Sequence, residues 1–463
     1  MFKQLFLLFS LLIFALTLPT GLVPPSQDSF YSAPTGFESA ELGTILKFRP
    51  SPAPIRSVYF KVKIKSSWQL LVRSSDSFGN PSVIVTTVFE PFNADPSKLI
   101  SYQVAQDSAS NDCSPSYAFM DGGGFETVTS QAEMLLIQTA LDQGYYVVSP
   151  DYEGLKAVYT GGIQSGHGTL DSLTAALTSK NITGINSDAK SILWGYSGGA
   201  LAAGWAAALQ PTYAPDLKQS LLGAALGGFV TNVTATVTAV NGGPFSGLVG
   251  MGIAGLSNEY PELKDYLKEQ MYPDKYEQFQ EIYGLCTAEG ALKFAFTDYF
   301  NGPNKYVNGI GVLANEPAAS ILKNNTLGLV PSQVPDIPLF VYHGVIDSLV
   351  PYKETERVYN TWCDEGIESF ELAADLTAGH LTEVLQGSGA AFGWITKRFD
   401  GKAPISGCRK TKRLTNLLYP GTVGSVTNLI SALFTNVLGG DIGPNGESMK
   451  PGNSELDHFF HIN

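Results

Sequence analysis

The chain has 463 residues, of which 42 are Asp or Glu and 29 are Lys or Arg, giving a net charge of −13 at pH 7. This acidic balance, with no cluster of lysines and arginines that resembles a basic binding face, argues against a nucleic-acid partner. Apolar residues make up 44% of the chain, which excludes a mainly disordered protein, and the length suits either one large α/β core with an insertion or two domains.

The first twenty residues have the layout of a secretory signal peptide. Lys3 precedes an apolar run over residues 5–16, and small and polar residues follow from Thr17 to Gly21. The run is short for a membrane span, although an uncleaved anchor is the alternative, and no later stretch reaches the apolar length of a transmembrane helix. We therefore expect residues 1–20 to be a signal peptide and the mature protein to be soluble and secreted.

Glycosylation acceptors and cysteines agree with export. Asn-x-Thr triplets begin at Asn181, Asn232 and Asn324. An even number of cysteines suits two disulfides in any of three connectivities: Cys113, Cys286, Cys363 and Cys408. A bridge between Cys363 and Cys408 would close a loop that contributes about 4 kcal/mol. No Cys-x-x-Cys motif or His/Cys cluster indicates a metal site, and we expect no cofactor.

Patterns in the first half of the chain predict a sheet that becomes parallel. Residues 22–45 contain several prolines and are expected to form an extended surface segment. Alternating and β-branched stretches at 57–65, 69–74 and 81–89 predict an antiparallel opening of the sheet. Strands and helices then alternate, which predicts a parallel sheet covered on both faces, with a strand at 98–104, a helix at 131–143, a buried strand from 145, a helix at 168–180 and a strand at 192–194.

Gly195-Tyr196-Ser197-Gly198-Gly199 has the Gly-x-Ser-x-Gly pattern of a nucleophile elbow. It lies between the apolar strand at 192–194 and an Ala-rich helix at 200–209. In this turn small residues flank the serine, so that its hydroxyl projects over the carboxyl edge of the sheet. The pattern also arises by chance, and a spectator serine in a Gly-rich turn is the alternative. Its place between a strand and a helix predicts an α/β-hydrolase core with Ser197 as the nucleophile.

The regular alternation stops after a strand at 219–228. Residues 232–325 show helical patterns separated by Gly-rich pieces, which predicts a helical cap inserted between core strands. Within it, the apolar residues 247–256 fit a surface that contacts oily substrate as well as they fit a buried helix. Two further strands are predicted at 337–345 and 369–374, and the second is expected to be the last core strand. Helices are predicted at 353–364, from 381 and at 427–438. A loop at 439–446 is expected to lie across the site.

A serine nucleophile needs a base and an orienting acid, which in α/β-hydrolases follow it in the order Ser, Asp or Glu, His. Of the five histidines, His380 alone fits the turn after the last core strand, while His343 lies inside a strand and is expected to be structural. Asp347 follows the strand that contains His343, at the carboxyl edge of the sheet. Asp336 precedes that strand and is a poor rival, and Asp375 remains an alternative because it lies near His380 in the sequence.

The oxyanion that forms during acyl transfer needs N–H donors. Gly198, directly after the nucleophile, is expected to supply one. The other is expected from the loop after the strand at 99–104, where Asp107 is one candidate and Gly122-Gly123-Gly124 is its competitor. We favour Asp107 because it follows the strand directly.

Several motifs act together as a set: Gly195-Tyr196-Ser197-Gly198-Gly199, Gln106-Asp107-Ser108 with Asp112-Cys113, Ser149-Pro150-Asp151-Tyr152-Glu153-Gly154, His343-Gly344 with Asp347 and Val350-Pro351, and Gly379-His380. This set resembles the secreted fungal lipases of the lipase-A type, the yeast secretory lipase family, over nearly the whole mature chain. The resemblance implies triacylglycerol hydrolysis by a triad of Ser197, Asp347 and His380, with oxyanion donors at Asp107 and Gly198. It also implies a helical cap, a C-terminal flap around 439–452 and the disulfide pairs Cys113–Cys286 and Cys363–Cys408.

The expected organisation is a signal peptide at 1–20, a core formed by 21–231 and 326–463, and a cap at 232–325. The expected activity is that of a secreted serine carboxylic-ester hydrolase, a triacylglycerol lipase that acts as a monomer on lipid at an oil–water interface. An esterase for short soluble esters is the first alternative. A peptidase with the same triad and an inactive binding or adhesion protein that keeps the core are the others.

Overall fold

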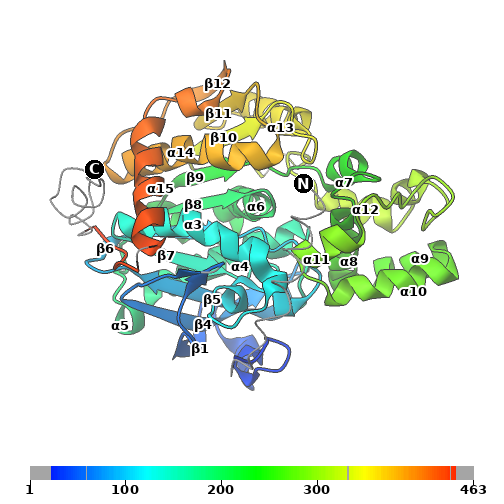
Figure 1. Ribbon diagram of the computed structural model, residues 1–463, viewed down its shortest axis with the longest axis horizontal. Helices are drawn as coiled ribbons and strands as arrows, with labels where there is room; N and C mark the ends of the chain where they lie inside the picture. The colour runs from blue at the N-terminus through cyan, green and yellow to red at the C-terminus, as the bar shows by residue number, and fades with distance from the viewer. Residues whose placement is uncertain (1–21, 59, 331–332, 438, 445–463) are drawn as a thin grey trace, which may run out of the picture.

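A ten-stranded sheet forms the centre of the computed structural model, which describes residues 22–58, 60–330, 333–437 and 439–444 (Figure 1). The strands are hydrogen-bonded in the order β1-β4-β5-β7-β6-β8-β9-β10-β11-β12. The pairs β1–β4, β4–β5 and β5–β7 are antiparallel, and every later pair is parallel. Their bounds are β1 (Ile45–Pro50), β4 (Ser66–Ser75), β5 (Pro81–Glu90), β6 (Asp95–Gln103), β7 (Tyr145–Pro150), β8 (Lys190–Tyr196), β9 (Leu221–Gly227), β10 (Leu339–Gly344), β11 (Ser369–Asp375) and β12 (Gly407–Arg413).

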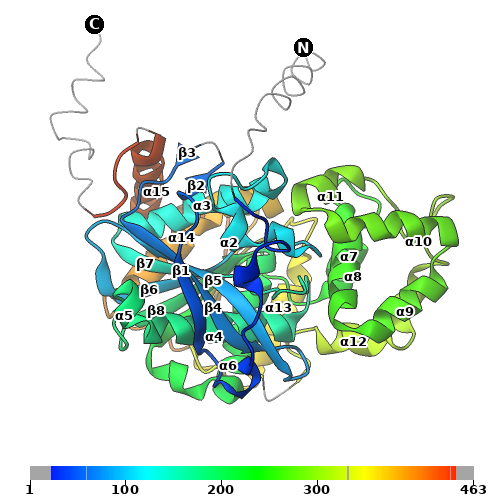
Figure 2. The same ribbon diagram turned by 90° about the horizontal axis from the view of Figure 1, so that it is seen from below.

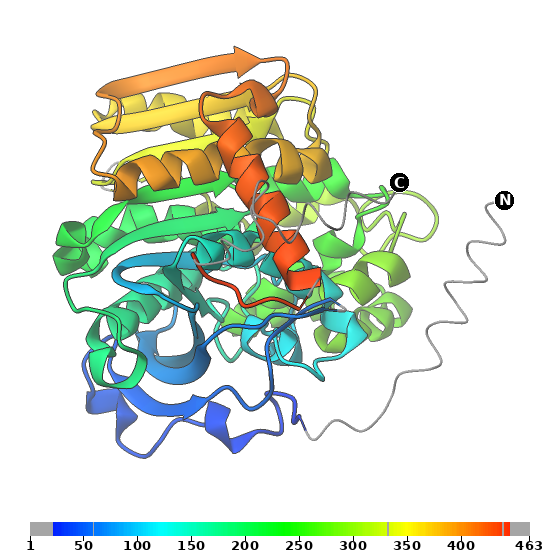
Figure 3. The ribbon, with the colours of Figure 1, turned by 60° about the vertical axis from the view of Figure 1, so that its left-hand side comes forward.

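Helices cover both faces of this sheet because successive side chains of a strand point to opposite sides. In β8, Leu193 belongs to one apolar layer, whereas Ile192 and Trp194 belong to the other. The first layer contains α4 (Gly162–Thr178), α6 (Gly198–Tyr213) and α13 (Tyr352–Asp364). The second lies under α3 (Val128–Asp142) and α14 (His380–Phe399), and α15 (Thr422–Val437) packs obliquely across these two helices (Figure 3). The sheet is therefore buried on both sides, as the alternation of strands and helices predicts.

The helices between β9 and β10 form a separate layer at the side of the core (Figure 2). They are α7 (Val233–Val240), α8 (Gly247–Glu259), α9 (Pro261–Gln270), α10 (Pro273–Gln280), α11 (Thr287–Lys293) and α12 (Ala318–Asn324). The glycines of α8 let this layer approach the core closely: a Cβ at Gly255 would lie 2.6 Å from the backbone nitrogen of Tyr159. The Thr160 hydroxyl also donates to the Gly252 carbonyl oxygen at 3.1 Å.

The strand predicted at 57–65 is not part of the central sheet. In the described part of this segment, β2 (Arg56–Ser57) and β3 (Phe60–Lys61) pair as a separate two-stranded sheet, and Lys63 forms an isolated bridge with Asp441. Val58, between them, has φ +49°, which interrupts the extended backbone. Val62 is buried, so the alternating pattern reflects the packing of a short irregular segment on the core.

The prediction that residues 369–374 form the last core strand is also wrong, because β12 continues the sheet beyond β11. Its sequence is mostly polar and basic, and its side chains are largely exposed. Arg409 pairs with Glu371 at 2.6 Å and Lys410 with Glu356 at 2.9 Å. Basic side chains of this kind are typical of an edge strand that avoids pairing with other molecules, and they hide it from a search for apolar alternation.

Two disulfides join distant parts of the fold. Cys113–Cys286 connects the loop after β6 to the start of α11, and Cys363–Cys408 connects α13 to β12. These are the pairs that the family resemblance implies. One disulfide thus ties the helical layer between β9 and β10 to the core, and the other ties the edge strand to a helix.

Two predicted segments reach outside the described residues. The signal peptide at 1–20 lies wholly outside them, as do residues 445–452 of the predicted flap. Residues 439–444 pack at the amino end of β7, where the Phe92 N–H donates to the Ile442 carbonyl oxygen at 2.9 Å and Pro444 lies beside Gly144. This is the edge of the sheet opposite to Ser197, so the described part of the flap does not cover the predicted site. Within the described ranges, no helix combines the length and apolar character needed to cross a membrane.

Candidate active site

Ser197 occupies a sharp turn between β8 and α6. Its backbone has φ +53° and ψ −119°, outside the usual regions for a residue with a side chain. The neighbouring glycines make the turn possible: a Cβ at Gly195 would lie 2.4 Å from the carbonyl carbon of Gly199, and one at Gly199 would lie 1.9 Å from the carbonyl oxygen of Gln103. The Gly-x-Ser-x-Gly pattern therefore folds as the tight strand-to-helix turn that the sequence predicts.

His380, the first residue of α14, lies between Ser197 and Asp347. Its Nε2 is 2.8 Å from the Ser197 Oγ, and its Nδ1 is 2.7 Å from the Asp347 Oδ2. Because a carboxylate only accepts, Nδ1 carries the proton and Nε2 is free to accept from the serine hydroxyl. The structure thus brings the three predicted residues together from three separate loops at the carboxyl edge of the sheet.

Asp347 is fixed by its own loop. The backbone N–H groups of Leu349 and Val350 donate to its Oδ1 at 2.9 and 2.8 Å. Burial alone would raise the pKa of Asp347, but hydrogen bonds with His343 and His380 outweigh burial and hold the pKa well below its usual range. The Asp347 side chain is therefore a carboxylate at neutral pH.

His343, in β10, supports the Asp347 loop through hydrogen bonds, in keeping with the structural role expected for it. Its Nδ1 accepts the Phe229 backbone N–H at 3.2 Å, so its proton is on Nε2, which donates to the Val350 carbonyl oxygen at 3.0 Å. Tyr196 is a further positioning residue that the sequence analysis missed. Its hydroxyl donates to the His380 carbonyl oxygen at 2.6 Å, and thereby links the elbow to the histidine turn.

The two alternative acids lie elsewhere. Asp375 accepts the backbone N–H groups of Thr377 and Ala378 at 2.9 Å and that of Asn416 at 2.6 Å, so it shapes the turn before His380. Asp336 pairs with Lys218 at the surface, at 3.1 Å. The only carboxylate that the structure places on the His380 ring is Asp347, among the described residues.

Asp107 and Gly198 lie side by side next to Ser197. Asp107 has φ +50°, and a Cβ at Gly198 would lie 1.9 Å from the Asp107 Oδ1. Both residues line the same pocket as Ser197 and His380, whereas the competing Gly122-Gly123-Gly124 does not, and Gly123 instead packs against the Tyr117 carbonyl oxygen. Burial raises the pKa of the Asp107 carboxyl group to about 7.

The loop that carries Asp107 is held from two sides. The Ala105 N–H donates to the Glu133 Oε1 at 2.9 Å, and the hydroxyl of Thr287 in α11 donates to the Gln106 carbonyl oxygen. Ser108 donates to the Leu285 carbonyl oxygen at 2.8 Å. Segment 285–287, which contains Cys286, therefore holds the loop, and the helical layer between β9 and β10 contributes directly to the geometry around Asp107.

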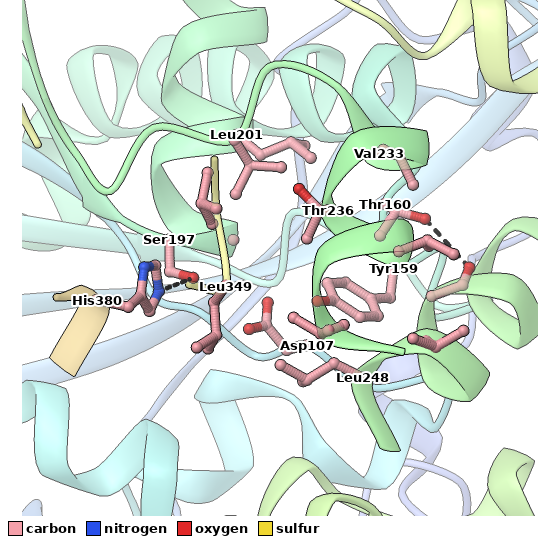
Figure 4. Close-up of a pocket in the computed structure, with 17 residues that line it drawn as sticks. Asp107, Tyr159, Thr160, Ser197, Leu201, Val233, Thr236, Leu248, Leu349 and His380 are labelled. Atoms are coloured by element: carbon pink, nitrogen blue, oxygen red, sulfur yellow. Dashed lines mark hydrogen bonds between the residues drawn. The ribbon is translucent and has the colours of Figure 1, made fainter. Parts of the chain in front are cut away.

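An apolar pocket extends from Ser197 toward α7 and α8. Figure 4 shows Asp107 between Ser197 and His380 on one side and Tyr159 and Leu248 on the other. Aliphatic side chains from α6, α7, α8 and neighbouring loops form most of its wall: Leu201, Val230, Val233, Val237, Val240, Leu248, Val249, Leu349 and Val350. Leu248, Val249 and Gly252 belong to the stretch at 247–256, so this apolar helix contacts the pocket and is largely buried as well. No group of side chains suited to a metal ion occurs among the described residues.

Comparison with known proteins shows the family of the chain. A family model described as secretory lipase matches residues 121–407. The chain belongs to the secretory lipase family. This secretory lipase is 50% identical to Lipase 1 of Candida albicans over 441 residues, which cover 95% of the chain and 94% of that protein. It is 36% identical to Lipase A of Arthroderma benhamiae over 432 residues, which cover 91% of the chain and 90% of that protein.

A solved structure shows the same architecture. The secretory lipase aligns with the crystal structure of lipase A from Candida antarctica with a TM-score of 0.79 and 30% identity, covering 89% of the chain and 95% of that structure. The closed state of that lipase aligns with a TM-score of 0.78 and 29% identity, covering 92% of the chain and 99% of that structure. The α/β-hydrolase fold and the family predicted from the sequence are thereby confirmed.

Proposed function

We propose that Ser197, His380 and Asp347 are the catalytic triad of this lipase and that triacylglycerol is its substrate. The observation that carries the proposal is the position of the His380 ring, which hydrogen-bonds Ser197 through one nitrogen and Asp347 through the other. His380 Nε2 takes the Ser197 proton as Oγ attacks the acyl carbonyl carbon. Asp347 holds the ring orientation and stabilises the imidazolium that forms.

The N–H groups of Gly198 and Asp107 are proposed to stabilise the oxyanion of the tetrahedral intermediate. When this intermediate collapses, the ester C–O bond breaks, the alcohol leaves with the proton from His380, and the acyl group stays on Ser197. Water then gives a proton to His380 and attacks the acyl-enzyme. Collapse of the second intermediate releases the fatty acid and returns the proton to Ser197.

The substrate preference is argued from the pocket and the cap. Aliphatic side chains line the space beside Ser197, and an acyl chain gains about 0.8 kcal/mol for each buried CH₂ group. This favours long acyl chains over short soluble esters. We propose residues 232–325 as the cap that supplies much of this wall, within a core formed by residues 21–231 and 326–463.

The test is hydrolysis of esters from acetate to oleate, with emulsified triolein, by the wild type and Ser197→Ala. Ser187→Ala, at an exposed serine, is the matched control. We expect Ser197→Ala to lose at least about 10⁴-fold in kcat and the control to lose nothing. Cleavage of short esters alone would favour the esterase, and activity in Ser197→Ala would remove Ser197 from the mechanism.

Export and glycosylation are part of the same proposal. The family is named for secretion, and we propose that residues 1–20 direct export and that the protein acts outside the cell as a monomer. Asn181 and Asn324 are exposed and open to glycan attachment. Asn232 caps α7 through Oδ1 and donates to Glu354 at 3.1 Å, so we expect glycan on the first two asparagines and none on Asn232. Peptide mass mapping before and after glycan release checks this.

A further inference from the structure

Seven exposed aliphatic side chains gather at one end of the sheet, beside the triad. They follow the carboxyl ends of β10, β11 and β12 and occupy the first turns of α14. We call this set the leucine rim: Ile346, Leu376, Leu381, Leu385, Leu414, Leu417 and Leu418. Five of the seven are more than 60% exposed, although side chains of this kind gain free energy on leaving water.

Hydrogen bonds hold the segments of the leucine rim side by side. The Leu376 N–H donates to the Arg413 carbonyl oxygen at 2.8 Å, and the Thr377 hydroxyl donates to the Leu414 carbonyl oxygen at 2.8 Å. The turn that carries Ile346 is joined to β11 because the Val345 N–H donates to the Asp375 carbonyl oxygen at 2.7 Å. These bonds place the turns that carry Ile346, Leu376 and Leu414 next to one another.

Positive charge lies at the edge of this surface, where Arg413 lies over the Tyr419 ring at 4.5 Å and Lys397 donates to the Pro420 carbonyl oxygen at 3.2 Å. In segments 345–350, 376–386 and 414–421 themselves, the acidic and basic side chains are Asp347, His380 and Glu383, and all three are buried. Lys412 and Arg413 bound the surface on the strand side. In a protein with a net charge of −13, such a strip can enter an apolar phase with few charged side chains to desolvate.

The leucine rim also continues into the site. Ile346 precedes Asp347, Leu381 follows His380, and Leu349 and Val350, in the same loop as Ile346, line the pocket. We propose that the leucine rim docks the enzyme on the surface of neutral lipid, with the pocket facing that surface. This inference rests on the proposed lipase function, and it names the surface that brings substrate to the site.

The test uses Leu385→Gln/Leu414→Gln/Leu418→Gln, which removes three rim leucines that do not adjoin the triad in sequence. The control is Leu42→Gln/Leu292→Gln/Leu329→Gln, at three exposed leucines elsewhere on the chain. Both sets are placed in full-length Ser197→Ala protein and floated with triolein droplets coated with phosphatidylcholine. We expect the rim variant to bind at least about tenfold more weakly and the control to bind like the parent. Binding should be unchanged in 1 M NaCl and should not improve when phosphatidylserine is added.

The same substitutions in active enzyme separate docking from chemistry. With p-nitrophenyl butyrate below its solubility limit, the rim variant should keep its turnover within about twofold of wild type, whereas hydrolysis of emulsified triolein should fall at least about tenfold. Flotation equal to that of the parent, or an equal loss in the control, would overturn the proposal. A shift from dimer to monomer in the rim variant on sedimentation would also overturn it, since the rim would then bind a second copy. Because flotation uses inactive protein, failure of the proposed triad leaves this result intact.

Discussion

The glycine at position 199 offers a quantitative test of the elbow. A Cβ there would lie 1.9 Å from the carbonyl oxygen of Gln103 and 2.8 Å from its carbonyl carbon, whereas ordinary contact begins at 3.4 Å. In Gly199→Ala the end of β6 and the start of α6 must therefore separate by about 1.5 Å, and no flexible side chain is present at this contact to absorb the change. Overpacking of this kind costs about 1–3 kcal/mol of unfolding free energy.

Activity should suffer more than stability. The shift acts two residues from Ser197, whose Oγ is 2.8 Å from His380, and a misplacement of about 1 Å costs about 10²-fold in rate. We expect kcat/KM for p-nitrophenyl butyrate to fall about 100-fold, with a lower midpoint of thermal unfolding followed by circular dichroism. The control is Gly424→Ala in α15, where a Cβ meets nothing within 4 Å; it should gain about 0.5–1 kcal/mol and keep full activity. Wild-type turnover in Gly199→Ala would refute the claim that close approach to β6 demands a glycine.

Three further predictions concern the disulfides and Asp107. The Cys113–Cys286 bridge spans 173 residues, and its loss in a Cys→Ala pair should lower the free energy of unfolding by about 5 kcal/mol. The Cys363–Cys408 bridge spans 45 residues, and its loss should lower the free energy of unfolding by about 4 kcal/mol. Denaturant unfolding of the two variants measures both values. Only the loss of Cys113–Cys286 should also lower kcat, because hydrogen bonds with segment 285–287 hold the Asp107 loop. Equal activity losses in the two variants would contradict this. Burial raises the pKa of Asp107 from 3.8 to about 7. Above this pH a carboxylate beside Gly198 opposes the oxyanion, so wild-type kcat/KM should fall as pH rises through about 7. Asp107→Asn should abolish this fall. The pKa of Asp107 is higher in the folded than in the unfolded protein, so its protonated form contributes stability that is fully present below about pH 4 and is lost as pH rises through about 7. Thermal melts should therefore show the stability of Asp107→Asn relative to wild type to be greater at pH 8 than at pH 5. A stability difference independent of pH would exclude Asp107 as the titrating group.

The parts of the site that were predictable depend on local chemistry. Ser197 needs glycines around it, and Asp347 and His380 follow buried strands at the edge where parallel strands end, so sequence order favours them, although it leaves Asp375 as an alternative acid. The apolar stretch at 247–256 was recognised as a candidate for contact with substrate. Its position against Thr160 depends on contacts between distant segments, which no local pattern contains.

The parts that were missed have physical reasons. β12 carries basic side chains because it is an edge strand, and an exposed edge leaves no apolar alternation to detect. Tyr196 supports His380 through a hydrogen bond across 184 residues of sequence. A tyrosine inside an apolar strand predicts only a buried core residue, so the pattern does not indicate this role. The leucine rim consists of aliphatic side chains from three strand ends and the start of α14, which only the folded sheet brings together.

The two disulfides pair neighbours in order along the chain: the first cysteine with the second, and the third with the fourth. This order matters during synthesis in an oxidising compartment, because Cys113 emerges 173 residues before Cys286, roughly 10–35 s earlier at typical elongation rates. When Cys286 emerges, Cys113 is the single free thiol available to it, and the same holds for Cys363 when Cys408 emerges. Vectorial synthesis alone can therefore select the native pairing out of three, without later exchange between bridges.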